Sequence, residues 1–226
     1  MVPVAARRIL RGYHVIATGI ERMRMLKSAT VGVAENGNSA VLVTVASDGT
    51  LLDRRRVDLT HGLPTHPHHH QGSWAVGRYL DTPGATAMPL ADAVALVERI
   101  RAAAATGAGE SLDRLAAVVP VPIVAIAIRA CPELPATIEQ RIIDNRAQTY
   151  ADSVMYRQAF AAAAQARGWI VHWYERDNVM REAAIALDTR IDAFLTAMGK
   201  TAGPPWQAKH KLAAAAALAV RRISRH

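Results

Sequence analysis

The chain has 226 residues, of which 51% are hydrophobic and 20% charged, and it contains one cysteine, Cys131. This length suits one domain that buries a core of its own, the single cysteine excludes an intramolecular disulfide framework, and no apolar run approaches the ~18–20 residues that cross a bilayer. The formal net charge of +8 resides at the two ends, because residues 1–29 and residues 206–226 each carry +5, which leaves −2 for the residues between them.

The two ends are therefore basic arms on a slightly acidic body. Residues 1–29 are rich in arginine and poor in acids, which suits an organellar transit peptide or an extension that precedes the fold. They lack the continuous apolar segment of a secretory signal, and together with the single cysteine this favours a cytoplasmic protein. We expect the folded domain to span residues 30–220, with a basic tail at residues 221–226.

Three strands are predicted at the start of the domain. Residues 30–35 are β-branched and apolar, and Asn36-Gly37 follows them, which is a strong signal for a hairpin. Residues 40–46 form a continuous apolar run, and residues 51–59 alternate between apolar and charged side chains. The first two runs are typical of buried strands and the third of a strand with one wet face at a sheet edge, so the domain opens with an antiparallel meander.

A connection of about thirty residues, 60–89, separates the third strand from the next helix and carries a run of histidines. Loops of this length inside a compact domain are often functional. Imidazole nitrogens bind zinc and similar metals, but the spacing matches no closed zinc site, so a polar loop is the favoured interpretation. The run consists of His66, His68, His69 and His70.

The second half of the chain alternates helices and strands. Apolar side chains at helical spacing predict a helix from Leu90 that Gly107 and Gly109 break, with a short helix or a continuation after them. The apolar run 121–128 is typical of a central parallel strand. A capping-box pattern at Thr137 opens a long predicted helix, 137–167. The remaining elements are a strand at 169–174 and helices at 178–187, 191–198 and 206–220.

The order β-β-β-α-β-α-β-α resembles that of the RNase H-like superfamily, which includes the RuvC-type resolvases. Residues 32–37, Gly-Val-Ala-Glu-Asn-Gly, resemble its first strand, where an acidic residue precedes a glycine-containing turn. Residues 156–174 resemble its helix, turn and fifth strand, and residues 210–215 its alanine-rich last helix. The resemblance covers residues 30–220 and implies an α/β fold with a mixed five-stranded sheet, three antiparallel strands and then two parallel ones, flanked by helices.

The resemblance also implies a metal-dependent nuclease that acts on nucleic-acid phosphodiesters. In that family two divalent ions, Mg²⁺ or Mn²⁺, are held by side chains of the first strand, the fourth strand and the last helix. The matching residues here are Glu35, Glu133 and His210. The chain departs from the family pattern in having glutamate at the first position, a displaced second carboxylate, and Ala213 where an aspartate commonly stands. The two basic arms would then contact phosphates.

Each of the three residues also has a plainer explanation. Glu35 suits a solvated strand end, Glu133 an exposed loop acid, and His210 one more basic surface residue. In the RNase H-like fold the third strand runs parallel to the first and fourth, so the histidine-rich connection leaves from the end of the sheet that bears Glu35. It could fold over that end as a lid, which would place beside the site His66, His68, His69, His70 and Trp74.

The predicted long helix supports a second interpretation. Its polar side chains recur at steps of three and four residues and so share one face. Amide, carboxylate and hydroxyl groups mixed with arginine suit recognition, although an ordinary polar face is the plainer explanation. The alternative function is a catalytically inactive RNase H-like binding or assembly module, whose contact face comprises Arg141, Asp144, Asn145, Gln148, Asp152 and Tyr156.

Overall fold

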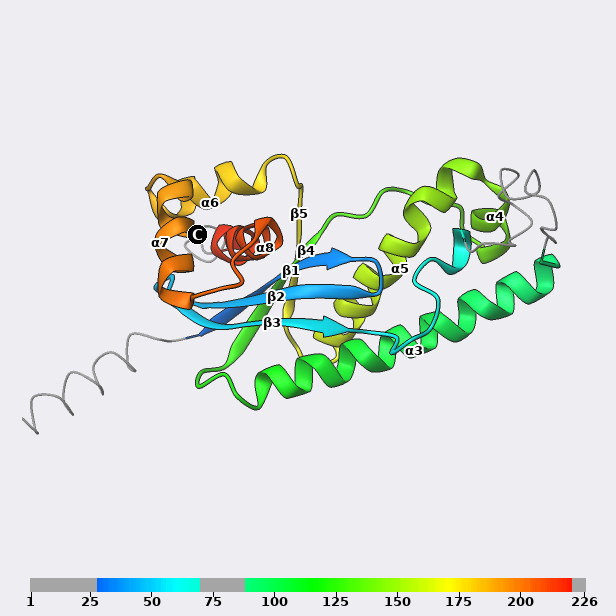
Figure 1. Cartoon of the computed structure of the whole chain (residues 1–226), viewed down its shortest axis with the longest axis horizontal. Coiled ribbons are helices and arrows are strands. Elements are labelled where there is room, and N and C mark those ends of the chain that lie inside the picture. Colours follow the sequence, from blue (N-terminus) through cyan, green and yellow to red (C-terminus); the bar gives the residue numbers. More distant parts are fainter. Residues whose placement is uncertain (1–27, 70–87, 221–226) are drawn as a thin grey trace, which may run out of the picture.

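The computed structural model describes residues 28–69 and 88–220. Most of the two basic arms lies outside these residues, and so do His70, Trp74 and the side chain of His69, all from the predicted lid. The described residues form a layered α/β arrangement, with helices on both faces of one sheet (Figure 1). Within those residues, no helix combines the length and the apolar character that a membrane span requires.

A mixed five-stranded sheet forms the middle layer. In space its order is β3-β2-β1-β4-β5. The first three strands pair in antiparallel fashion, and β4 and β5 run parallel to β1. This is the sheet of the RNase H-like fold, so the predicted fold class and the edge position of β3 are confirmed. The strands are β1 (Ala29–Asn36), β2 (Ser39–Ala46), β3 (Leu51–Asp58), β4 (Ile123–Arg129) and β5 (Ile170–Tyr174).

The first hairpin turn is shifted by one residue from the prediction. Asn36 pairs with Ser39, so the two central residues are Gly37 and Asn38 rather than Asn36 and Gly37. Of these two, Gly37 has the positive φ, at +59°. A glycine with positive φ at the first central position is the pattern of a type II′ turn, whose twist matches that of the flanking strands.

Helices cover both faces of the sheet, and each face has its own hydrophobic core. Neighbouring residues of a strand point to opposite faces, so Leu42 of β2 packs in one core and Val43 in the other. The first core lies under α3 (Leu90–Ala116), α4 (Ile138–Ile143) and α5 (Asn145–Gln165). The second lies under α6 (Val179–Leu187), α7 (Ile191–Ala202) and α8 (Ala208–Ala219).

Helix α8 crosses β1 at very short range. A Cβ added to Gly32 would lie 1.8 Å from the carbonyl oxygen of Ala213. Glycine on the strand is therefore required for this approach. The residues of α8 at 213–217 are all alanine and all buried. This contact places the first turn of α8 next to the end of β1.

The predicted helix over 137–167 is in fact two helices, so that prediction is wrong. Asp144 separates α4 from α5, with φ −80° and ψ 112°, which is extended backbone. Its Oδ1 accepts hydrogen bonds from the N–H groups of Arg146 at 2.7 Å and Ala147 at 2.9 Å. A side chain that bonds the following backbone in this way caps a helix and starts a new one.

Helix α3, by contrast, runs through both glycines that were predicted to break it. A Cβ added to Gly107 would lie 2.3 Å from the carbonyl oxygen of Leu59. The helix therefore crosses the chain just after β3 at a point where a side chain would not fit. A Cβ at Gly109 would meet Arg167 Nη2 at 3.9 Å, which is ordinary contact.

These two glycines give a matched pair of substitutions. Alanine gains about 1 kcal/mol of helix propensity at either position. We expect Gly109→Ala to raise the free energy of unfolding by about 1 kcal/mol, and Gly107→Ala to lower it by about 1–3 kcal/mol, because its methyl group meets main-chain atoms. Urea unfolding followed by circular dichroism measures both. Equal stabilisation by the two variants would contradict the close crossing at Gly107.

Candidate functional site

The end of β1 carries a buried ion pair. Glu35, the next-to-last residue of the strand, contacts Arg157 of α5, and their side chains are 9% and 5% exposed. Arg157 Nε donates to Glu35 Oε1 at 2.8 Å, and Nη2 donates to the same oxygen. Arg157 Nη1 donates at 2.8 Å to the carbonyl oxygen of Ala130, just after β4. One guanidinium group therefore joins the ends of two neighbouring parallel strands.

A second cation, Lys209, reaches the same strand end from α8. Its Nζ donates to the backbone carbonyl of Glu35 at 2.8 Å and to Asn36 Oδ1 at 2.9 Å. Burial lowers the pKa of Lys209; Glu35 raises that pKa, and Arg176 and Arg56 lower it. The end of β1 thus lies in surroundings that are rich in positive charge.

The other two predicted metal ligands line two different hollows. Glu133 is exposed in the loop after β4, in an open polar hollow that it shares with Cys131 and Arg157. His210 lies in the first turn of α8, where its Nδ1 accepts a hydrogen bond from the backbone N–H of Gln207 at 3.2 Å. This bond helps to cap the helix. The His210 ring also lines a second, basic hollow.

The described residues do not fit the Mg²⁺ or Mn²⁺ site that the resemblance implies. Within residues 28–69 and 88–220, no three side chains of histidine, cysteine, aspartate or glutamate are grouped so that they could hold a metal ion. Such ions need several oxygen ligands, whereas the carboxylate of Glu35 already neutralises Arg157. Ala213, where the family commonly has aspartate, is fully buried in the packing of α8.

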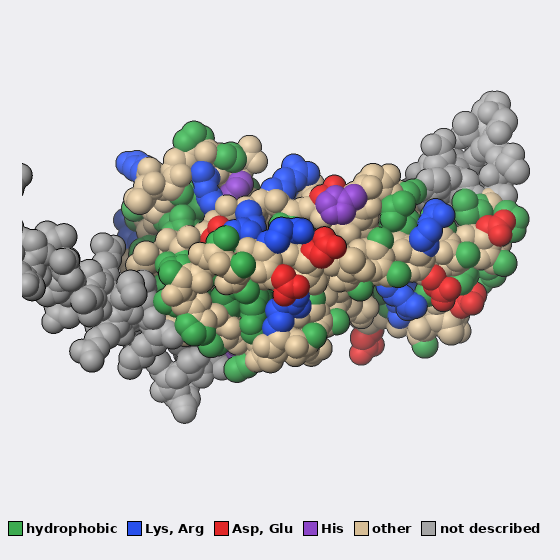
Figure 2. All heavy atoms as spheres, turned by 90° about the horizontal axis from the view of Figure 1, so that it is seen from below, with side chains coloured by type: hydrophobic (Ala, Val, Ile, Leu, Met, Phe, Trp, Pro, Cys, Tyr) green, Lys and Arg blue, Asp and Glu red, His purple; other side chains and the backbone are tan. Residues whose placement is uncertain are grey.

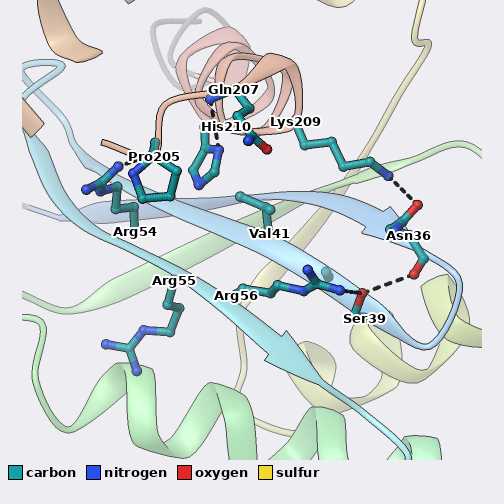
Figure 3. A pocket seen from close by; sticks show the side chains of 11 residues that line it. Asn36, Ser39, Val41, Arg54, Arg55, Arg56, Pro205, Gln207, Lys209 and His210 are labelled. Carbon is teal, nitrogen blue, oxygen red and sulfur yellow. Dashed lines mark hydrogen bonds between the residues drawn. The ribbon is translucent and has the colours of Figure 1, made fainter. Parts of the chain in front are cut away.

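A groove of about 550 Å³ lies between β3 and the start of α8 (Figure 3). Figure 3 shows Arg54 beside Pro205, Arg56 directed at Ser39, and Arg55 pointing away from the groove. No acidic side chain belongs to its described lining. We call this surface the basic groove; it is lined by Asn36, Ser39, Ala40, Val41, Arg54, Arg55, Arg56, Pro205, Gln207, Lys209 and His210.

The arginine side chains that enter the basic groove are bonded to neutral oxygens. Arg56 donates to Ser39 Oγ at 3.2 Å. Arg54 donates to carbonyl oxygens at the end of α7 and just after it, those of Ala202, Pro204 and Pro205. These partners carry no charge, so neither guanidinium charge is compensated by them. Arg55, by contrast, forms an ion pair with Asp53 at 2.7 Å on the other face of β3.

Neighbouring cations act on the two ionisable residues of α8 that line the groove, His210 and Lys209. Burial lowers the pKa of His210, and Arg54 lowers it further. Burial likewise lowers the pKa of Lys209, and Arg56 is among the groups that lower it further. A bound anion would relieve this repulsion, because an opposite charge favours the charged form of a base. The arrangement is therefore suited to binding anions.

The sequence alone did not reveal the basic groove. It indicated a wet face on β3, a C-terminal basic arm and a metal ligand at His210, as three separate features. A period of two places Arg54 and Arg56 on one face of the strand, and that signal was available in the sequence. Their approach to the first turn of α8 depends on the close crossing of that helix over β1, which no local pattern predicts.

The predicted recognition face is largely internal. Gln148, Asp152 and Tyr156 are buried, and the hydroxyl of Tyr156 donates to the carbonyl of Thr65 at 2.9 Å. Burial raises the pKa of Tyr156 above its usual value. Asp144 is exposed but is occupied as the helix cap. Two further members keep some exposure, Arg141 and Asn145. The six residues therefore do not form one exposed contact face.

The described part of the predicted lid lies against α5 and the first hairpin turn. His68 Nδ1 is 2.7 Å from Asp152 Oδ1, and His66 Nδ1 is 3.5 Å from Asp152 Oδ2. A Cβ added to Gly37 would lie 2.4 Å from Thr65 Cγ2, so the connection after β3 also packs on the turn that follows β1. A cover over Glu35 formed by His69, His70 and Trp74 stays a prediction.

No protein-family model matches the sequence, and no curated protein matches it. The structure is similar to that of RuvC from Thermus thermophilus in complex with a Holliday junction substrate, with 16% identity over 88% of this chain and 95% of that chain and a TM-score of 0.46. Another Thermus thermophilus RuvC structure gives 16% identity, 87% and 96% coverage, and a TM-score of 0.45. At this identity the likeness concerns the fold alone.

The pair Glu35–Arg157 can be tested by a double-mutant cycle. Removing one partner leaves the other charge buried without compensation, so we expect Glu35→Gln and Arg157→Met each to lower the free energy of unfolding by about 3–5 kcal/mol. The double variant should lose about 1–3 kcal/mol less than the sum of the two single losses. Urea unfolding measures all four proteins. Strict additivity would show that the two side chains do not interact in solution.

Proposed function

We propose that this chain binds nucleic acid by its phosphate backbone in the basic groove. The observation that carries the proposal is that Arg54, Arg56 and Lys209, which bond to uncharged oxygens, face one hollow that has no acidic side chain in its described lining. Phosphate oxygens are strong acceptors for guanidinium and ammonium groups. Contacts of this kind supply most of the affinity of sequence-independent binding to nucleic acid.

An extended polyanion suits the groove better than a single small anion. Arg54 and Arg56 are two residues apart on β3, which is ~6.6 Å along a strand, and Lys209 lies across the groove from them (Figure 3). The first turn of α8 adds the partial positive charge of a helix N-terminus. Figure 2 shows basic side chains in the middle of the face seen from below, with acidic ones among them. The three cations of the groove would contact several phosphates at once.

The chemistry of the groove favours binding without sequence recognition. Its charged groups are suited to phosphates, and contacts to phosphates position a nucleic acid without reading its bases. Lys209 also belongs to the C-terminal basic arm, so this arm contributes a cation to the groove. The proposed function is therefore binding rather than metal-dependent cleavage, because the carboxylate of Glu35 is engaged by Arg157.

Single substitutions in the groove test this proposal. We expect Arg56→Ala and Lys209→Ala to weaken binding to single-stranded, duplex and four-way-junction DNA alike, and each to reduce the slope of log K against log salt by about 1. Fluorescence anisotropy with labelled DNA over a salt series measures both quantities. Lys200→Ala is the matched control, since it removes one lysine charge from an exposed position of α7 outside the groove.

Two results would contradict the proposal. The first is the absence of salt-dependent binding by the wild-type chain at low salt. The second is a loss of affinity in Lys200→Ala equal to that in Arg56→Ala, which would indicate a diffuse charge effect instead of a groove. Binding of inorganic phosphate without binding of any DNA probe would likewise replace the polyanion by a small anion.

Titration with Mn²⁺ separates binding from cleavage. We expect that Mn²⁺ does not bind at Glu35, so the Mn²⁺ titrations of the wild type and of Glu35→Gln should be the same. We also expect no Mn²⁺-dependent cleavage of the same DNA probes, because the carboxylate of Glu35 is paired with Arg157. Isothermal titration calorimetry and a gel assay provide the two measurements. Binding and cleavage that are present in the wild type and are both lost in Glu35→Gln would instead establish the nuclease that the family resemblance implies, with Glu35 as a metal ligand.

A further inference from the structure

The segment after β3 forms a strap, residues 60–69, that is anchored at its start. The backbone N–H groups of Thr60 and His61 donate to Asp58 Oδ1 at 2.9 Å and 3.0 Å. The hydroxyl of Thr60 accepts a hydrogen bond from Asn38 Nδ2 at 2.9 Å. These bonds fix the first residues of the strap to the end of β3 and to the first hairpin turn.

The far end of the strap is held by a single buried carboxylate, that of Asp152 on α5. Both the backbone N–H of His68, at 3.1 Å, and His68 Nδ1, at 2.7 Å, bond to Asp152 Oδ1. His66 Nδ1 faces the other oxygen, Oδ2, at 3.5 Å. The short helix Pro67–His69, which contains His68, packs against α3, α4 and α5. One carboxylate therefore contacts two imidazoles and contributes to holding the strap on α5, together with the bond from Tyr156 to the carbonyl of Thr65.

The two histidines differ in their exposure to solvent. The side chain of His68 is 1% exposed, whereas that of His66 is 62% exposed. Among the described residues, the buried Nε2 of His68 has no hydrogen-bond partner, and the polar contact of that ring is the bond of its Nδ1 to Asp152. His66 can exchange protons with solvent freely. It is therefore the member of the cluster whose charge follows the pH of the medium.

The directions of the pKa shifts define the pH range of this contact. Interaction with Asp152 raises the pKa of His66 above its usual 6.5 despite burial. Burial raises the pKa of Asp152, but the bonds from His66 and His68 lower it more, so it lies below its usual 3.8. The two charges are thus fully paired between about pH 3.8 and pH 6.5, and the pairing is lost as the pH rises through the raised pKa of His66.

Other charges near the strap do not reverse this sign. In the described part of the chain, the groups that act on Asp152 are His66 and His68. Burial raises the pKa of Tyr156, one turn further along α5, and the charges of Asp152 and Asp58 raise that pKa further. Tyr156 therefore stays neutral and keeps its bond to the carbonyl of Thr65. The net change above neutral pH is the loss of one positive charge next to a buried negative one.

We propose that the strap is a pH-sensitive clasp, closed on α5 by protonated His66 and ionised Asp152 and loosened when His66 loses its proton. The bond between His68 and Asp152 persists at high pH. The strap therefore loosens around Thr65 and His66 but is not fully released from α5. Thr65 and His66 pack on the hairpin turn, where they lie beside Gly37. The device depends on these contacts alone and is independent of nucleic-acid binding.

Hydrogen exchange measured by mass spectrometry tests the clasp, because a loosened strap exposes its backbone amides to solvent. After correction for intrinsic rates, we expect amides of residues 61–68 in the wild type to exchange roughly two- to fivefold faster at about pH 8.5 than at about pH 5.5, the size of effect known for partly exposed ion pairs. In His66→Gln this pH dependence should be absent. Because His66 is largely exposed, that variant should fold.

His61→Asn is the matched control. It removes a histidine from the same strap without touching Asp152, and asparagine tolerates the left-handed backbone at this position, where φ is +41°. It should keep the pH dependence of the wild type. Equal exchange of the wild-type strap at both pH values, or a pH dependence that survives in His66→Gln, would overturn the proposal. His68→Gln should accelerate exchange at both pH values.

Discussion

The guanidinium group of Arg157 is the interaction on which the rest of the site depends. It is almost completely removed from water, and a buried charge is tolerated only when it is paired and its donors are satisfied. Glu35 supplies the opposite charge and the carbonyl of Ala130 a further acceptor, so the ends of β1 and β4 are fixed relative to α5. In this arrangement the carboxylate of Glu35 serves as the counter-ion of an arginine. The acidic residue at this strand position therefore has a different role from the one implied by the family resemblance.

The close crossing of α8 over β1 explains one departure from the family pattern, Ala213 in place of an aspartate. With Gly32 opposite the carbonyl of Ala213, the helix lies very near to the strand, and its residues 213–217 are all buried alanines. A carboxylate at this position would have to be accommodated in that packing. The same approach brings Lys209 to the end of β1 and His210 to the rim of the basic groove. A helix that provides metal ligands in one setting thus provides cations here.

The sequence predicted the backbone layout well and the site only in part. All five strands, the edge position of β3 and the helices after β5 follow from apolar periodicity, which depends on neighbouring residues. The break at Asp144 and the continuity of α3 through Gly107 were not predicted. The side chain of Asp144 ends one helix and caps the next. The absence of a side chain at Gly107 lets α3 continue past the backbone of Leu59. The basic groove and the burial of Asp152 could not be predicted, because their partners are distant in the sequence.

Two ions of opposite sign fix the position of α5 along its own axis. Asp152 and Arg157 are five residues apart, which is ~7.5 Å along the helix, and each has partners on a different part of the chain. The buried residues of α5 between and around them include several alanines, Ala147, Ala151, Ala159, Ala163 and Ala164, and also Tyr156 and Phe160, which are among the largest fully buried side chains of the described residues. These two aromatic side chains pack in the first core and oppose sliding of the helix. A shift by one residue would in addition leave both ions buried without partners, so the charges and the hydrophobic contacts together specify the register of this helix.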